Sequence, residues 1–424
     1  MFISRSSLWT ALDCKDEERT RVYLERSKLL PVNLSLDAED SLTPYHTFSN
    51  IIPHVIGRLK SLDIEGTPEN LQEIAAHLSH PAPLLEELSI CGSLDNEPDR
   101  YPVLAPTIFN GDLSSLRELC LERVRTELPW RNMVSLTSFD LFSMSPGEVT
   151  VGQFLDFFES APNLREIHLD SAAPTSGAQN RRLVSLACLE WMNIASSGSA
   201  SLLLDHLLIP VGARLEIEVD FPNPSINGHP PRFLDNLRNL SNSTTIELSG
   251  SESHSYLTFS GLNGKVAMIT SDRTRLVLEY LDQFDTSRTE HLMIGYSKSR
   301  SSDLPCRALL PMKHLRTLML CRFESSHTFI RALHPGMSSL GTVVCPQLEE
   351  LHIELMGETL DLKDVIGMAA ARASKGAKFK SVRIVQSRYT RTDVLELKKY
   401  VLHVDCGPEF DGTDGDGDDV DGGD

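Results

Sequence analysis

The sequence predicts an α/β fold in which one strand-and-helix unit repeats along most of the chain. Two observations lead to this prediction. A short pattern, in which an apolar residue is followed by further apolar residues three and five positions later, recurs at near-constant spacing. Between its copies lie stretches with apolar residues at helical spacing and with helix-capping residues. A strand and a helix that cannot bury their apolar faces alone bury them against the next unit, so such units stack.

The apolar pattern is clearest in nine copies, whose last residues alternate as a half-buried strand does. These copies are "LKSLDI" (59–64), "LEELSI" (85–90), "LRELCL" (116–121), "LTSFDL" (136–141), "LREIHL" (164–169), "LEWMNI" (189–194), "LRTLML" (315–320), "LEELHI" (348–353) and "FKSVRI" (379–384). Weaker copies lie at 214–219, 244–248, 265–270 and 289–294. The second apolar position advances by about 26 residues, with a range of 20 to 33, through 62, 88, 119, 139, 167, 192, 217, 246, 268, 292, 318, 351 and 382. This spacing matches the period of leucine-rich repeats with some long insertions.

Helices are predicted between several copies. Residues 67–80 start with a Thr N-cap and a Pro at the first helical position, and residues 150–162 have the same kind of pattern. Residues 232–241 and 362–376 are similar, and Gly376 is a stop signal for the last of these helices.

The predicted fold is therefore α/β, a leucine-rich-repeat solenoid over residues 51–390. It would form an irregular horseshoe, with parallel strands on the concave face and helices outside. An ordinary α/β domain is the alternative. The least regular part is 197–300, where a long loop is the other interpretation.

Composition and charge restrict the class of partner. The chain has 424 residues, of which 41% are hydrophobic and 23% charged, as in ordinary folded proteins. The formal net charge is −19. Residues 405–424 hold nine acidic residues and no Lys or Arg, so the rest of the chain keeps −10, and we predict a disordered acidic tail there. Nucleic acid and membrane are not expected as partners, because nucleic acid and anionic lipid attract positive charge.

No motif marks a catalytic, cofactor or metal site. The eight cysteines are scattered without CxxC spacing, and no GxSxG, P-loop or GxGxxG motif occurs. The tail "DGTDGDGDDVDGGD" (411–424) lacks the Gly and Glu positions of a calcium loop. His168, His291 and His352 fall on predicted strands several repeats apart, so a shared metal is not predicted. We therefore expect a protein that is not an enzyme and has no cofactor. We also expect a cytoplasmic or nuclear location, since no signal peptide or membrane-length apolar run is visible.

The N-terminal segment resembles part of a known family. Residues 6–37, "SSLWTALDCKDEERTRVYLERSKLLPVNLSLD", contain the pair Leu8–Trp9 and the run "VYLERSKLLPVNLSL" (22–36). The stretch "IIPHVIGRLKSLDI" follows at 51–64. Together they resemble the end of the F-box, a short helix and the first repeat in fungal F-box proteins with leucine-rich repeats. The resemblance implies that residues 1–37 are a remnant of the F-box edge plus a linking helix, with Leu8 and Trp9 packing at that edge.

Members of this family are typically substrate receptors of cullin-RING (SCF-type) ubiquitin ligases. The resemblance therefore implies a non-enzymatic protein that presents a bound protein through its repeats. The adaptor-binding helices of the family, of the types "LPxE" and "CxxWxxIA", do not precede Leu8. The sequence thus gives no direct support for a Skp-type adaptor or a cullin as partners, and either a shortened member or a missed upstream segment would account for this. A repeat scaffold without a link to ubiquitination is the alternative function.

Acidic residues flank the apolar positions of the predicted strands. Side chains at the flanking positions point away from the buried face, toward the open, concave side. The candidate protein-binding residues are Asp63, Glu65, Glu87, Glu118, Glu122, Asp140, Glu166, Asp170, Glu350 and Glu354. Weaker copies add Glu216, Glu218, Asp220 and Glu247, and Arg383 is the only basic residue at these positions. We expect this face to bind a basic segment of a protein partner, and the alternative is a solvated acidic face without a partner.

Overall fold

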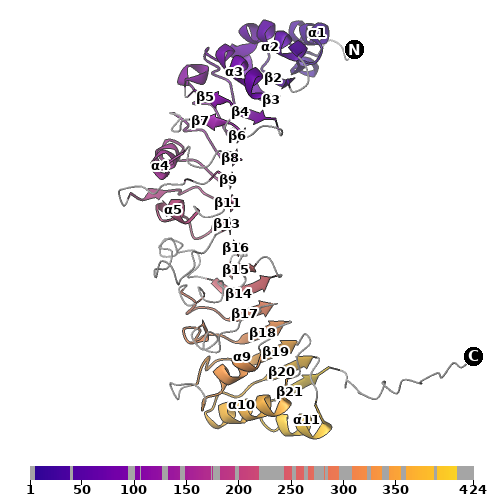
Figure 1. Ribbon diagram of the computed structural model, residues 1–424, viewed down its shortest axis with the longest axis vertical. Coiled ribbons are helices and arrows are strands. Elements are labelled where there is room, and N and C mark those ends of the chain that lie inside the picture. The colour runs from indigo at the N-terminus through magenta and orange to yellow at the C-terminus, as the bar shows by residue number, and fades with distance from the viewer. Residues whose placement is uncertain are drawn as a thin grey trace, which may run out of the picture. The chain divides into compact units, whose positions relative to one another are not determined.

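The chain folds into two compact units, Met1–Asn239 (unit 1) and Leu240–Asp424 (unit 2). The computed structural model describes residues 5–38, 42–93, 101–105, 107–126, 132–143, 149–172, 174, 182–195, 200–218, 243–250, 255–261, 266–271, 281, 285–295, 308–321, 326–336, 343–354, 360–385 and 389–407. Both units combine strands with helices, and parallel pairing dominates (Figure 1). The predicted α/β class with a large parallel sheet is therefore confirmed.

The sheet of unit 1 is parallel, and each of its described strands pairs with the next one along the chain. The strands are β1 (Ala11–Asp13), β2 (Val32–Ala38), β3 (Leu59–Gly66), β4 (Glu87–Gly92), β6 (Glu118–Glu122), β8 (Ser138–Phe142), β9 (Glu166–Asp170), β11 (Trp191–Ala195) and β13 (Arg214–Glu218). From β3 onward they coincide with the predicted copies of the apolar pattern. Strands β1 and β2 extend the sheet into the segment 6–37.

The apolar positions of the pattern form buried ladders across these strands. Leu88 pairs with Leu119, and the ladder continues through Phe139 and Ile167, all of them at most 2% exposed. The repeat positions 192 and 217 predict that Met192 pairs with Ile217, and this register is wrong. Met192 pairs with Leu215 and not with Ile217, because "RLEIEV" alternates evenly and fits the sheet equally well after a shift of two residues.

Helices cover the buried face of the unit 1 sheet. The helices of unit 1 are η2 (Ser6–Trp9), α1 (Glu17–Ser27), α2 (Leu42–Val55), η3 (Ile56–Arg58), α3 (Pro68–His77), η5 (Ile108–Gly111), α4 (Val151–Ser160) and α5 (Ala200–Leu204). Helices α2 to α5 lie along one side of the strands (Figure 1). The predicted helix start at 67 is confirmed, since the Thr67 hydroxyl accepts the Asn70 N–H. Two short parallel pairs, β5 (Val103–Leu104) with β7 (Arg125–Thr126) and β10 (Val184–Ser185) with β12 (Leu207–Leu208), supplement these helices.

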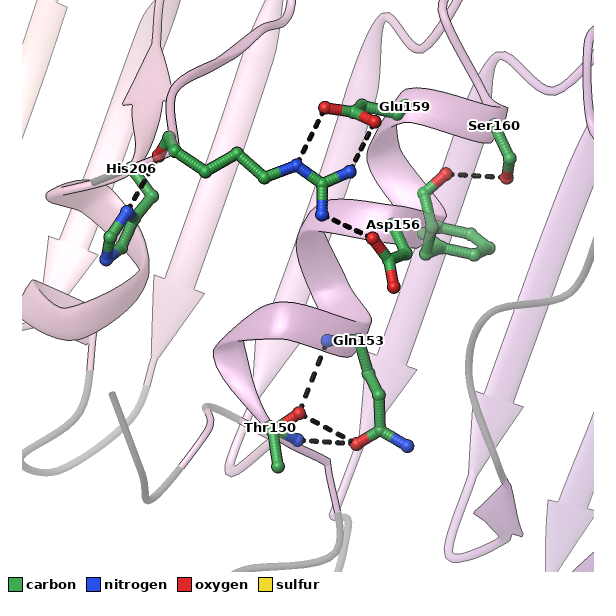
Figure 2. A network of polar contacts seen from close by, with 8 residues as sticks. Thr150, Gln153, Asp156, Glu159, Ser160 and His206 are labelled. Carbon is green, nitrogen blue, oxygen red and sulfur yellow. Dashed lines mark hydrogen bonds and ion pairs between the residues drawn. The ribbon is translucent and has the colours of Figure 1, made fainter. Parts of the chain in front are cut away.

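Helix α4 illustrates how this outer layer is fixed (Figure 2). Thr150 and Gln153 form a capping box, in which each side chain accepts the backbone N–H of the other residue. Phe157 packs on Phe139 of β8, with 4.5 Å between ring centroids. On the outer side, the Arg182 guanidinium pairs with Asp156 and, through two donors, with Glu159, while its carbonyl oxygen contacts His206 Nδ1 at 2.8 Å. These contacts tie α4 to the segments that carry β10 and β12.

Unit 2 contains a mixed sheet. Its strands are β14 (Ser243–Gly250), β15 (Ser255–Gly261), β16 (Val266–Ser271), β17 (His291–Gly295), β18 (Thr317–Cys321), β19 (Glu350–Glu354), β20 (Ser381–Val385) and β21 (His403–Cys406). From β17 to β21 neighbours in the chain pair in parallel, and β17 also pairs with β14 in parallel. Strands β14, β15 and β16 instead form an antiparallel meander. The expected parallel strand at 265–270 is thus antiparallel to its neighbour β15, because it returns from a hairpin and not from a crossover.

The described helices of unit 2 are α9 (Ser326–Leu333), α10 (Leu362–Ser374) and α11 (Arg391–Leu397), and α10 packs beside both of the others. The predicted helix at 362–376 is confirmed. Gly376 follows it with φ +82°, a conformation that favours glycine. The predicted helix at 232–241 lies outside the described residues, as do Asp220 and residues 408–424 of the predicted tail. Within the described ranges, every helix is too short or too polar to cross a bilayer.

Candidate functional site

The two faces of the unit 1 sheet differ in chemistry. On strands β4, β6, β8 and β9, side chains alternate between fully buried and at least partly exposed. The buried side chains meet the helices, and the others form the face that we call the open face of unit 1. The register places the side chains of this open face in three rows across the strands, because paired residues of parallel neighbours lie side by side about 4.8 Å apart.

The three rows follow directly from the strand pairing. The first row is Asn33, Ser61, Glu87, Glu118, Ser138, Glu166, Trp191 and Arg214. The middle row is Asp13, Ser35, Asp63, Ser89, Cys120, Asp140, His168, Asn193 and Glu216. The third row is Asp37, Glu65, Cys91, Glu122, Phe142, Asp170 and Ala195. Eight of the ten predicted binding residues therefore share one surface.

Most carboxylates of this open face lack a basic partner. Among the residues that the structure describes, seven of the predicted residues form no ion pair: Asp63, Glu65, Glu87, Glu118, Asp140, Glu166 and Asp170. Glu87 and Glu118 are directly paired across adjacent strands, and such like charges repel each other. The open face thus carries negative charge that the described part of the fold does not neutralise.

Two basic residues neutralise the third row locally. Arg123 lies beside Glu122 at 2.7 Å, and its Nε donates to the Gly92 carbonyl oxygen at 2.6 Å. Only glycine fits at the end of β4, because a Cβ on Gly92 would lie 2.6 Å from the Arg123 carbonyl oxygen. Lys15 pairs with Asp37 at 2.9 Å, and this contact raises the pKa of Lys15. Glu122 consequently contributes less free negative charge than Glu118 or Glu166.

From β4 onward the middle row is partly withdrawn from water, and the pKa values of Cys120 and Asp140 reflect this. Burial raises the pKa of Asp140, the neighbouring Glu166 adds to the rise, and His168 opposes it. Burial also raises the pKa of the Cys120 thiol to about 12, with Asp140, Glu122, Cys91 and Asp63 contributing in the same direction. The pKa of the Cys91 thiol, in the neighbouring third row, is raised to about 11, mainly by burial. Both thiols therefore stay protonated at neutral pH, which does not favour a nucleophilic role.

The remaining predicted residues lie in unit 2. Glu350 is exposed and accepts a hydrogen bond from the Thr317 hydroxyl at 3.3 Å. Glu354 lies at the other end of the same strand. Glu247 pairs with Met293, and this row continues through Met319 and His352 to Arg383, which contacts Asp405 at 3.3 Å. The corresponding face of unit 2 is thus less acidic than the open face of unit 1.

The pair Leu8–Trp9 lies in η2, next to helix α1. Trp9 packs edge-on against Tyr23 with 4.9 Å between centroids, and the Arg26 guanidinium lies 4.6 Å from the Trp9 ring centroid. Leu8 is 53% exposed. Trp9 is therefore held by the "RVYLERS" helix, whereas Leu8 presents apolar surface to solvent.

Two aromatic residues of the open face were not among the predicted site residues. Phe142 and Trp191 occupy the same flanking positions as the acidic candidates, and both are partly exposed. Charge alone, as the criterion at those positions, excludes them. Side-chain size at the same positions is the signal that identifies both.

Among the described residues, no group of three or more His, Cys, Asp and Glu side chains is arranged to hold a metal ion. His168 lies on β9 of unit 1, and His291 and His352 lie on β17 and β19 of unit 2. No protein-family model matches the chain, and no curated protein matches it either.

Proposed function

We propose that this protein is a non-enzymatic leucine-rich-repeat recognition module that binds a basic segment of a protein partner on the open face of unit 1. One observation carries the proposal: acidic residues from successive strands stand in shared rows, and most have no ion-pair partner among the described residues. A folded protein that keeps unneutralised like charges side by side gives up stability. A cationic partner would recover that loss.

The leucine-rich-repeat solenoid is the fold that we propose for this module. Support comes from the 20-to-33-residue spacing of the strands, from their pairing in chain order, and from helices along one side. In such a fold the strands would line the concave face and the helices would lie outside. A partner segment lying across several strands would then meet all three rows at once.

Charge would act on both the rate and the strength of binding. A surface of one sign steers an oppositely charged partner and raises the association rate, and exposed charges are screened beyond about 8 Å at physiological salt. Binding by exposed residues such as Glu118 and Glu166 should therefore weaken as salt rises. The half-buried Asp140 should be screened less, because its surroundings contain less water.

A role as substrate receptor of an SCF-type ubiquitin ligase is the more specific form of the proposal, and it rests on the resemblance of residues 6–37 and 51–64 to F-box proteins. The second candidate is a scaffold with no link to ubiquitination. One observation favours the scaffold: residues 11–13 and 32–38 are strands of the sheet itself, with α1 between them. This segment therefore packs as part of the sheet, and not as a separate helical adaptor-binding module.

The test compares partners recovered with the tagged full chain and with two triple variants. In the first, Glu118, Asp140 and Glu166 are all replaced by Lys. The matched control replaces Glu25, Glu69 and Glu73 by Lys, so the change in net charge is equal. These three residues lie exposed on α1 and α3. We expect basic partners to be lost with the first variant and retained with the control. Equal recovery with both would refute the proposed surface.

The same purification separates the two candidate functions. Recovery of a Skp-type adaptor and a cullin with the wild-type chain supports the ligase receptor. Recovery of basic partners without adaptor and cullin supports the scaffold. Circular dichroism of both triple variants checks that the fold is retained, since charge reversal on a sheet can also destabilise it.

A further inference from the structure

Three rings cross the open face of unit 1 in one diagonal line. Phe142 ends β8, His168 is the central residue of β9, and Trp191 begins β11. The imidazole of His168 lies 4.6 Å from the Phe142 ring centroid, edge-on at 77°, and 5.8 Å from the Trp191 ring centroid. We call these three residues the aromatic diagonal.

Carboxylates lie beside each ring of the aromatic diagonal. In the strand register, Asp140 is paired with His168, Glu166 with Trp191, and Asp170 with Phe142. None of these carboxylates forms an ion pair with a described residue. Asn193 Nδ2 contacts His168 Nε2 at 3.4 Å and helps to fix the imidazole between the two larger rings.

This combination suits one kind of cation better than others. An aromatic face carries negative electrostatic potential and attracts a cation within about 6 Å of its centroid. A guanidinium group is planar and weakly hydrated, so it stacks on a ring while its edge donors reach carboxylates in a fork. A lysine ammonium is compact and strongly hydrated, and it gains less from stacking. The large exposed carboxylate rows alone would not distinguish the two.

We propose that the aromatic diagonal anchors an arginine side chain of the partner segment. The guanidinium stacks on Trp191 or Phe142, and its donors pair with the carboxylates of Glu166, Asp140 or Asp170. The proposal rests on the protein-binding function proposed above and specifies the partner further. The partner segment needs arginine at this point, whereas lysine suffices along the rest of the acidic rows.

The arrangement within the fold supports an anchor role. Trp191 and Phe142 are partly exposed, so part of each ring remains accessible to a partner. Asp140 is half-buried, and burial makes its ionised form energetically costly. A cation beside the carboxylate lowers that cost. Hot spots of binding surfaces are enriched in Trp and Arg and are surrounded by groups that exclude water. The aromatic diagonal has the ring component, and the partner would supply the arginine.

The experiment titrates the full chain with two short synthetic peptides, one alternating Arg with Ser and the other alternating Lys with Ser, and measures heat of binding. The wild-type chain should bind the Arg peptide more tightly. Trp191→Leu should weaken binding of the Arg peptide by about 5- to 30-fold and abolish its advantage over the Lys peptide. The matched control Trp9→Leu removes a partly exposed indole elsewhere in unit 1 and should leave both affinities unchanged.

A second measurement keeps the proposal testable if Trp191→Leu does not fold. Trp191→Phe retains a ring, so its fold should persist. The difference in tryptophan fluorescence between the wild-type chain and Trp191→Phe reports on the Trp191 indole, and it should change when the Arg peptide binds.

The outcomes separate this inference from the proposed function. In one outcome both peptides bind the wild-type chain with equal affinity, the triple charge reversal lowers both affinities, and Trp191→Leu changes neither. The acidic face then binds basic segments, but the arginine anchor is refuted. An unchanged Trp191 fluorescence on binding refutes it too. If neither peptide binds, the proposed function and the anchor both fail.

Discussion

Arg372 is fully buried in helix α10, although no described carboxylate pairs with it. Its two terminal nitrogens donate to the carbonyl oxygens of Val344 and Cys345 at 2.7 and 2.8 Å. The guanidinium also lies 5.0 Å from the Phe379 ring centroid. Burial lowers the pKa of Arg372 to about 10, so the group remains charged at neutral pH. The side chain thus holds the turn before β19 against α10.

Arg372→Met should destabilise unit 2 by about 2 to 4 kcal/mol, because buried carbonyl groups lose charged donors while the volume stays similar. Urea unfolding followed by far-ultraviolet circular dichroism measures this, since the tryptophans, at 9, 130 and 191, all precede unit 2. Arg331→Met on the exposed side of α9 is the matched control and should have little effect. A cost for Arg372→Met as small as that of the control would contradict the structural role of Arg372.

Asp140 should show the opposite behaviour, a functional residue that costs stability. Its pKa is raised in the folded chain, so its ionised form destabilises the fold at neutral pH. That cost shrinks as the pH falls through the raised pKa of the folded chain, and it is gone below the ordinary aspartate pKa, where the carboxyl is protonated in both states. Asp140→Asn should therefore stabilise unit 1 at neutral pH by a few tenths to about 1 kcal/mol, and the gain should shrink in acid.

Tryptophan fluorescence in urea measures the gain from Asp140→Asn, with Asp63→Asn on the exposed middle row of β3 as the control. Asp140→Asn should also weaken binding of the basic peptides. A loss of stability at neutral pH would show that the Asp140 carboxylate is satisfied within the fold and is not held for a partner.

Helix α4 is attached to its neighbours by an ion-pair network that can be measured directly. Arg182 reaches Glu159 through two donors and Asp156 through a third (Figure 2). A double-mutant cycle with Arg182→Ala and Glu159→Ala should give a coupling of about 0.5 to 1 kcal/mol, falling as salt rises. The pair Arg165–Glu190, joined by a single contact of 3.2 Å between more exposed side chains, should couple less strongly. Equal coupling in the two cycles would rule out the two-donor geometry.

The elements with a local signal of their own could be predicted from the sequence. Strand β6 follows from the alternation in "LRELCL", and helices α3 and α4 follow from the N-caps Thr67 and Thr150. The resemblance of residues 6–37 to an F-box edge and linking helix does not predict that β1 and β2 extend the sheet, although "VNLSLDA" alternates as a strand does. The antiparallel meander of β14, β15 and β16 could not be predicted, since a strand pattern does not specify whether its partner is parallel or antiparallel.

The charge of the whole chain conceals a difference between its two units. The open face of unit 1 places carboxylates in all three rows, whereas the middle row of unit 2 runs from Glu247 through Met293, Met319 and His352 to Arg383. A net charge of −19 says nothing about this division. Binding of a basic segment should therefore concentrate on unit 1.

The candidate site was predictable in part. Glu118, Asp140 and Glu166 could be placed on one surface because the repeat fixes both their side of the strand and the neighbouring strand. The pairing of Glu122 with Arg123 could not be predicted, since Arg123 lies beyond the strand in a turn with φ 50°. The contact between His168 and Trp191 depends on a diagonal across two strands, which requires the three-dimensional register.

Carboxyl labelling tests the central claim most directly. The full wild-type chain is treated with a carbodiimide and an amine, with and without the Arg peptide, and the modified residues are identified by mass spectrometry. We predict that labelling of Asp63, Glu118 and Glu166 falls when the peptide binds, while labelling of Glu25, Glu69 and Glu73 on the helices stays the same. Equal loss of labelling on both sets, or loss on the helices alone, would contradict binding at the open face of unit 1.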